Sequence, residues 1–171
     1  MFNNHVEELE THETRIIVGF PGVGKTTFFE QNRQFKCADS DSSRFSWVAP
    51  GLRNPEFPQN YIEHIKASIG RFDLIFVSSH DLVRKALKDE RIPYYVVYPS
   101  KDLKDEYIQR YVKRGNQESF VRLLEDHFEE FIDSIEQDDY PTLIPLQSGE
   151  YLADVIPTLQ ERGKRANDLS S

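Results

Sequence analysis

The stretch "VGFPGVGKTT", residues 18–27, is the strongest indication of the fold in this sequence. From Gly19 to Thr26 it satisfies the spacing G-x-x-x-x-G-K-[S/T], in which a glycine-rich turn joins a strand to a helix and wraps around phosphate groups. An apolar run, residues 15–18, comes directly before it, and a helix-forming segment, residues 25–34, comes after it. We therefore expect a strand, a phosphate-binding turn and a helix in this order.

The residue types in this turn suit the triphosphate tail of ATP or GTP bound with Mg²⁺. Glycines at 19, 22 and 24 allow positive φ angles and a close approach of the backbone to phosphate oxygens. We expect Lys25 on the β- and γ-phosphates, the Thr26 hydroxyl on Mg²⁺ and Thr27 on the α-phosphate. The alternative is a turn that only connects strand and helix. The predicted nucleotide-binding residues are Gly19, Gly22, Val23, Gly24, Lys25, Thr26 and Thr27.

The composition predicts one globular domain. The chain has 171 residues, of which 38% are hydrophobic and 29% charged, and its net charge is −8. This charge argues against a broad nucleic-acid-binding face, because phosphate backbones are held by basic surfaces. The single cysteine, Cys37, fits a reducing compartment. With no apolar run of eighteen residues and no leader pattern, we expect no membrane segment and a cytoplasmic location.

Strands and helices alternate along the sequence. We expect strands at about 15–19, 35–39, 72–79, 93–99 and 142–146, with helices between them and a loop over residues 40–60. This alternation predicts an α/β fold in which helices cover both faces of a parallel sheet. Ligands of such sheets bind beyond the carboxyl ends of the strands, which directs attention to the polar residues there.

Acidic, basic and aromatic residues follow the second expected strand. Asp39 and Asp41 can position magnesium or an attacking oxygen, and Arg44 can hold an anionic acceptor. Trp47 and Arg53 suit stacking on a base and holding a phosphate. The alternative for the acidic residues is an ordinary polar turn.

The third expected strand lacks an acidic residue at its carboxyl end. A Walker-B acid would be expected there, but Asp73 lies at the beginning of that strand. Asp39 or Asp41 is therefore the candidate for the missing magnesium role. We name Thr26 and Asp39 as metal ligands and Asp41 as a catalytic carboxylate.

Arg110 and Arg114 follow the fourth expected strand and share one helical face. Two arginines above a phosphate site can neutralise the charge on a phosphoryl group during transfer, and a helix at this place can act as a closing lid. The alternative is a solvated basic face beside Asp105 and Glu106. We assign catalytic roles to Lys25, Arg110 and Arg114.

With these features the chain resembles small P-loop kinases of the nucleoside monophosphate kinase class. The segments "DSDSSRFSW", "NPEFPQNYIEHIK" and "YVKRGN" are similar to small nucleotide kinases of bacteriophages. The resemblance implies a three-layer P-loop NTPase fold with strand order 2-3-1-4-5, spanning 1–171, with an acceptor-binding insert at about 40–70 and a lid at about 101–116. It also implies transfer of the γ-phosphoryl group of ATP, with Mg²⁺, to a (deoxy)nucleoside monophosphate, in the host cytoplasm if the chain is phage-encoded.

Two other functions stay open at this point. Asp41-x-x-Arg44 and Arg110-x-x-x-Arg114 are similar to motifs of polynucleotide 5′-kinases, in which the acidic residue is the general base and the arginine holds the acceptor's phosphate. The third possibility is a P-loop module that binds a nucleotide and acts as a switch. The negative charge favours a small nucleotide acceptor over nucleic acid. The sequence leaves the acceptor's base and sugar, ATP against GTP, and the oligomeric state open.

Asp41→Asn distinguishes the two kinase functions. If the acceptor is a nucleoside monophosphate, its phosphate oxygen is already ionised and needs no base. The variant should then lose activity, and a higher concentration of magnesium or of acceptor should restore most of it. A 5′-hydroxyl needs a base, and its loss costs about 10²- to 10⁴-fold. Steady-state rates at several magnesium and acceptor concentrations measure this. An oligonucleotide kinase activity that vanishes in Asp41→Asn at every magnesium level would contradict our preference.

Overall fold

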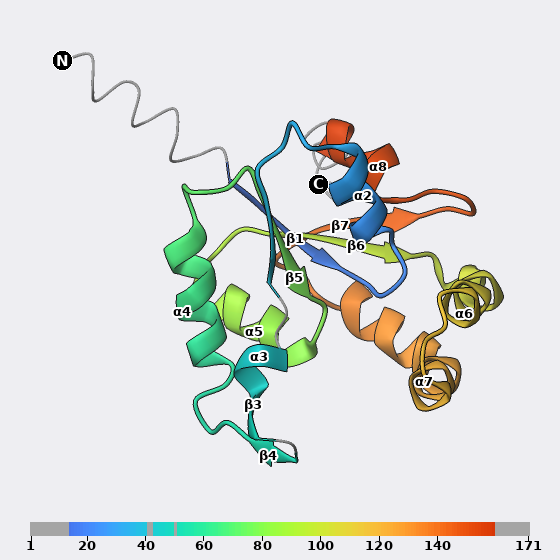
Figure 1. The fold of residues 1–171 in the computed structure, drawn as a ribbon, viewed down its shortest axis with the longest axis horizontal. Helices are drawn as coiled ribbons and strands as arrows, with labels where there is room; N and C mark the ends of the chain where they lie inside the picture. Colours follow the sequence, from blue (N-terminus) through green and yellow to red (C-terminus); the bar gives the residue numbers. More distant parts are fainter. Residues whose placement is uncertain (1–13, 41–42, 50, 160–171) are drawn as a thin grey trace. The chain divides into compact units, whose positions relative to one another are not determined.

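The five main strands form one parallel sheet. The computed structural model describes residues 14–40, 43–49 and 51–159, and Figure 1 shows its strands and helices. The chain divides into two compact units. Unit 1 holds the described residues up to Val18 together with Phe29–Tyr95, and unit 2 holds Gly19–Phe28 together with the described residues from Val96 onward.

Unit 1 contains three strands of the main sheet and a separate hairpin. The first four residues of β5, from Leu74 to Val77, are buried, as expected for a parallel strand covered on both faces. Helix α4 buries Tyr61, Ile62 and Ile65 and ends before Gly70, whose φ of 88° lets the chain leave the helix. The elements of this unit are β1 (Arg15–Gly19, which ends in unit 2), β2 (Cys37–Ser40), α3 (Ser43–Ser46), β3 (Trp47–Ala49), β4 (Leu52–Arg53), α4 (Gln59–Ser68), β5 (Leu74–Ser78) and α5 (Asp81–Asp89).

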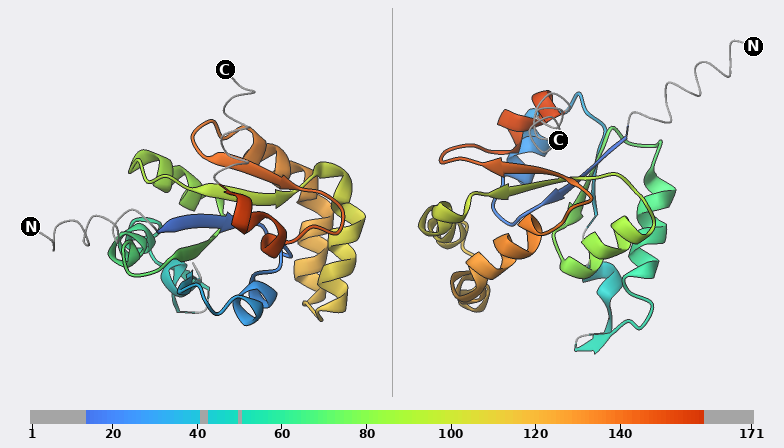
Figure 2. Two further views of the ribbon diagram at one scale, coloured as in Figure 1. Left: turned by 90° about the horizontal axis from the view of Figure 1, so that it is seen from above. Right: turned by 180° about the vertical axis from the view of Figure 1, so that it is seen from behind.

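Unit 2 contains the glycine-rich turn and the C-terminal elements. Its core contains a cluster of aromatic rings among aliphatic side chains. The centre of the Phe20 ring lies 5.6 Å from that of Phe128 and 6.4 Å from that of Tyr107, both in edge-on contact. Helices α6 and α7 lie side by side, as Figures 1 and 2 both show. The elements are α2 (Lys25–Gln31, which ends in unit 1), β6 (Tyr95–Pro99, which begins there), η1 (Lys101–Leu103), α6 (Lys104–Lys113), α7 (Glu118–Glu136), β7 (Thr142–Leu146), α8 (Leu152–Val155) and η2 (Ile156–Thr158).

The main sheet has the order β2-β5-β1-β6-β7, and β2 pairs with β5 in parallel, with Asp39 opposite Phe76. An α/β fold with a parallel sheet is therefore confirmed. The numerals differ from the expected order 2-3-1-4-5 because β3 and β4 form a second, two-stranded sheet and take two numbers of their own.

The prediction of a loop over residues 40–60 was wrong in part. It contains the short helix α3 and the antiparallel hairpin of β3 and β4, in which Trp47 lies opposite Arg53. The Arg53 guanidinium lies 4.4 Å from the centre of the Trp47 ring, and this cross-strand contact contributes to the stability of the hairpin. Within the described residues, no helix is both long and apolar enough to cross a membrane.

Candidate functional site: a cationic pocket at the glycine-rich turn

The glycine-rich turn is closed by backbone hydrogen bonds within unit 2. The Phe20 N–H donates to the Val97 carbonyl of β6 at 3.0 Å, and the Val23 N–H donates back to the Phe20 carbonyl at 3.3 Å. Gly22 and Gly24 have φ angles of 92° and 97°, which favour glycine. Gly19, which was also expected to use this freedom, is instead the last residue of β1. Two of the three glycines therefore shape the turn.

Three tyrosine rings occupy the space that side chains at these glycines would need. A Cβ built on Gly22 would lie 3.0 Å from the ring of Tyr111 and 3.2 Å from that of Tyr107. A Cβ on Gly24 would lie 3.0 Å from the ring of Tyr151. The glycines are thus required for packing as well as for backbone conformation.

Helix α6 holds two carbonyl groups of the turn. The Tyr111 hydroxyl donates to the Pro21 carbonyl at 2.7 Å, and Nη1 of Arg110 donates to the Gly22 carbonyl at 2.8 Å. Burial raises the pKa of Tyr111, which keeps the phenol protonated as a donor. Because a peptide group is planar, fixing these carbonyls also fixes the N–H groups of Gly22 and Val23.

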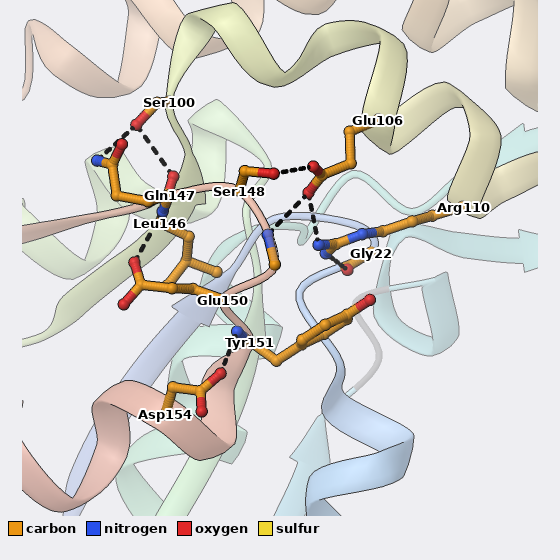
Figure 3. Close-up of polar contacts among 11 residues, drawn as sticks. Gly22, Ser100, Glu106, Arg110, Leu146, Gln147, Ser148, Glu150, Tyr151 and Asp154 are labelled. Atoms are coloured by element: carbon orange, nitrogen blue, oxygen red, sulfur yellow. Dashed lines mark hydrogen bonds and ion pairs between the residues drawn. The ribbon is translucent and has the colours of Figure 1, made fainter.

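The Arg110 guanidinium is held from four directions, and Figure 3 shows most of its partners. Its carbon lies 4.2 Å from the centre of the Tyr107 ring and 4.1 Å from that of Tyr151. Its Nη2 forms an ion pair of 2.9 Å with Glu106, one turn earlier in α6. The Arg110 side chain is only 12% exposed. These contacts leave the guanidinium little freedom to move.

The segment after β7 contacts both the glycine-rich turn and α6. The Leu152 N–H at the start of α8 donates to the Val23 carbonyl at 2.9 Å, which joins this segment to the turn. The Ser148 hydroxyl and the Gly149 N–H both donate to the Glu106 carboxylate. The Ser148 hydrogen bond, followed by those of Gly149 and Arg110, lowers the pKa of Glu106 and keeps it ionised. The turn, α6 and the loop after β7 therefore form one hydrogen-bonded network.

A pocket of about 310 Å³ opens between the turn and α6. Four of its lining residues carry a positive charge: Lys25, Arg110, Lys113 and Arg114. In a chain of net charge −8, this concentration of positive charge makes the pocket suited to an anion. The remaining lining residues are Gly22, Val23, Gly24, Thr26, Thr27 and Tyr151.

The structure brings most of the predicted nucleotide-binding residues together. All of them except Gly19 line the pocket, and so do Arg110 and Arg114. Arg114 is exposed, and its Nε and Nη2 donate to the Asn116 side-chain oxygen at 3.1 and 3.0 Å. It therefore lies at the pocket with far fewer constraints than Arg110.

The predicted acceptor-side residues belong to unit 1. Asp39 is an exposed residue of β2, and Trp47 and Arg53 lie on the exposed hairpin. The backbone of Arg44 lies in α3, but its side chain is outside the described part of the structure, and Asp41 lies outside the described residues altogether. Their assigned roles remain predictions.

The pocket lining includes the hydroxyl that was predicted to bind magnesium, that of Thr26. The exposed Thr26 hydroxyl is a hard oxygen donor of the kind that Mg²⁺ prefers, and Mg²⁺ commonly needs only one or two protein ligands beside phosphates and water. No cluster of three or more histidine, cysteine or acidic side chains that could hold a metal occurs within residues 14–40, 43–49 and 51–159.

Sequence reasoning missed Glu106, Tyr107, Tyr111 and Tyr151. Glu106 and Arg110 have the i, i+4 spacing of a helical ion pair, which was available as a signal, but Glu106 was considered only as part of the alternative, a solvated face. Nothing near Tyr151 in the sequence connects it with Gly24. Comparison with known proteins adds no further assignment, since no protein-family model matches the sequence and the search of curated proteins found no match.

Gly22→Ala tests the packing of the turn. We expect a loss of about 2 kcal/mol or more in the free energy of unfolding, because the left-handed backbone costs about 1–2 kcal/mol and the Tyr111 ring must also move. Gly115→Ala is the matched control, since Gly115 has a φ of 77° and a Cβ added there would meet no atom within 4 Å. Urea denaturation measures both. Equal losses would show that the tyrosine contacts contribute nothing.

Proposed function

We propose that this chain is a P-loop kinase that transfers the γ-phosphoryl group of ATP to a (deoxy)nucleoside monophosphate. The observation that carries the proposal is the pocket, in which the glycine-rich turn and four cationic side chains face one space. A triphosphate needs backbone donors and positive charge together, and the pocket offers both. The finer fold assignment, a three-layer P-loop NTPase fold, is part of the same proposal.

Five of the lining residues have a direct role in this reaction. Lys25 binds the β- and γ-phosphates, and Thr26 and Thr27 supply hydroxyl groups to Mg²⁺ and to the α-phosphate. Mg²⁺, when bound with ATP, supplies charge neutralisation at the phosphates. Arg110 and Arg114 stabilise charge that develops on the transferring group.

The acceptor is assigned to residues of unit 1. Arg44 and Arg53 bind anionic oxygens of the acceptor, Trp47 supplies an aromatic surface for its base, and Asp39 and Asp41 position magnesium or the attacking oxygen. One face of Trp47 is covered by Arg53, and the side chain of Trp47 is 41% exposed. A small nucleotide is favoured over a nucleic-acid strand because the net charge of −8 opposes a long phosphate backbone.

Purified protein with ATP and Mg²⁺, assayed against a panel of (deoxy)nucleoside monophosphates and a 5′-hydroxyl oligonucleotide, tests the proposal. We expect transfer to a monophosphate and none to the oligonucleotide. Lys25→Ala should abolish transfer and leave the fold intact, because the ammonium group acts on the phosphates and is not part of the core. The matched control is Lys85→Ala, at an exposed lysine paired with Asp89, which should be fully active. Near-normal turnover in Lys25→Ala would overturn the proposal.

Arg110→Ala and Arg114→Ala test the transition-state role. Each should lower kcat by roughly 10³-fold and raise the KM for ATP by much less, because the charge that the arginine meets on the bound triphosphate grows during transfer. Arg122→Ala, at an exposed arginine of α7, is the control for loss of positive charge. Rates within a few-fold of wild type for Arg110→Ala and Arg114→Ala would show that these arginines do not contact the transferring group.

A further inference from the structure

Glu106 is an acidic side chain in direct contact with the guanidinium of Arg110, and it is held more firmly than a surface carboxylate. The Ser148 hydroxyl donates to Oε1 at 2.5 Å, while the Gly149 N–H at 3.3 Å and Nη2 of Arg110 at 2.9 Å both meet Oε2 (Figure 3). Most helical i, i+4 ion pairs are solvated and worth little. This carboxylate is instead fixed by a second segment, the loop after β7.

That loop is itself well ordered by hydrogen bonds. The Gln147 N–H donates to the Glu150 carboxylate at 2.8 Å, and the Glu150 N–H donates to the Gln147 carbonyl at 3.0 Å. The Ser100 hydroxyl donates to the Leu146 carbonyl at 3.0 Å, where β7 ends. Ser148 and Gly149 are therefore presented to Glu106 from a closed turn.

The hydrogen bonds form a ring that returns to the glycine-rich turn. Glu106 holds Nη2 of Arg110, and Nη1 of Arg110 holds the Gly22 carbonyl. From Gly149 the chain runs through Tyr151, which covers Gly24, to Leu152, whose N–H binds the Val23 carbonyl. A change at Glu106 is thereby transmitted to the turn through Arg110 and through the loop.

An unrestrained arginine side chain loses much rotamer freedom when it binds a ligand. Here the carboxylate of Glu106 and the rings of Tyr107 and Tyr151 select one orientation of Arg110 before any ligand binds. The negative charge of Glu106 also offsets one positive charge at the pocket. If Arg110 only attracted anions, the pocket would attract them more strongly without the negative charge of Glu106. If Arg110 must hold one orientation, Glu106 is required.

We infer that Glu106 is a positioning residue, which fixes Arg110 against the Gly22 carbonyl and joins the loop at 147–151 to the phosphate-binding turn, so that a bound triphosphate meets a prearranged guanidinium. This inference rests on the proposed function, since it assumes that the pocket binds a nucleoside triphosphate. It adds a residue that touches neither the phosphates nor the acceptor but sets the affinity for the donor.

Glu106→Gln tests the inference by calorimetric titration of the whole chain with ATP and Mg²⁺. We expect binding about tenfold weaker than wild type, the effect of losing one charge-assisted hydrogen bond. The matched control is Glu118→Gln, because Glu118 forms the same i, i+4 pair with Arg122 but on the exposed surface of α7. Its affinity should stay within about twofold of wild type. Unchanged or tighter binding by Glu106→Gln would overturn the inference.

A double-mutant cycle separates positioning from general destabilisation. In an Arg110→Gln background, Glu106→Gln should change the Kd by only about twofold, because the route through Arg110 is lost and only the weaker route through the loop at 147–151 remains. The same tenfold loss in both backgrounds would overturn the inference.

Ser148→Ala, at an exposed loop residue, removes one hydrogen bond to Glu106 and should weaken ATP binding severalfold at an unchanged Tm. Full affinity in this variant would also count against the inference.

Lys25→Ala distinguishes failure of the inference from failure of the proposed function. If wild type binds ATP, Lys25→Ala does not, and Glu106→Gln equals wild type, only the positioning role is wrong. If wild type and Lys25→Ala alike show no binding, the proposed function is wrong and the positioning role is overturned with it.

Discussion

The carbonyl groups of Pro21 and Gly22 point at α6, where Tyr111 and Arg110 bind them. This constraint on two adjacent peptide groups organises the pocket, because planar peptides transmit it to the N–H groups that follow. It also requires tyrosine rings close to the backbone, which in turn requires glycine at 22. Backbone conformation, aromatic packing and the place of the cationic side chains are thus consequences of one set of contacts.

The two arginines that share a face of α6 differ in their surroundings. Arg110 lies between two aromatic rings and has charged and carbonyl partners, whereas Arg114 is exposed and bonded to Asn116. A guanidinium that is already oriented loses little entropy on binding a ligand, whereas an exposed one keeps more of its side chain in water until a ligand binds. The same helix therefore supplies one enclosed and one exposed positive charge to the pocket.

The acceptor side has a different physical basis. The hairpin of β3 and β4 depends on an exposed cation–aromatic pair between Arg53 and Trp47 and carries exposed Val48 and Leu52. Such a surface gains little from burial within its own unit. The segment's prolines and glycine predicted a loop, and the hairpin was missed because cross-strand contacts, which local composition does not report, stabilise it.

The sequence by itself determined the features that repeat over a few residues: the spacing of glycines and lysine in the turn, the buried strands, the amphipathic helices and the arginines one turn apart. These patterns are local, so they are readable without a fold. Only the tertiary structure decided what Arg110 does, since it lies 88 residues from Gly22 and the Glu106 that orients it is bound by Ser148, 42 residues away. Contacts of this range depend on how helices pack on strands, and no local periodicity encodes them.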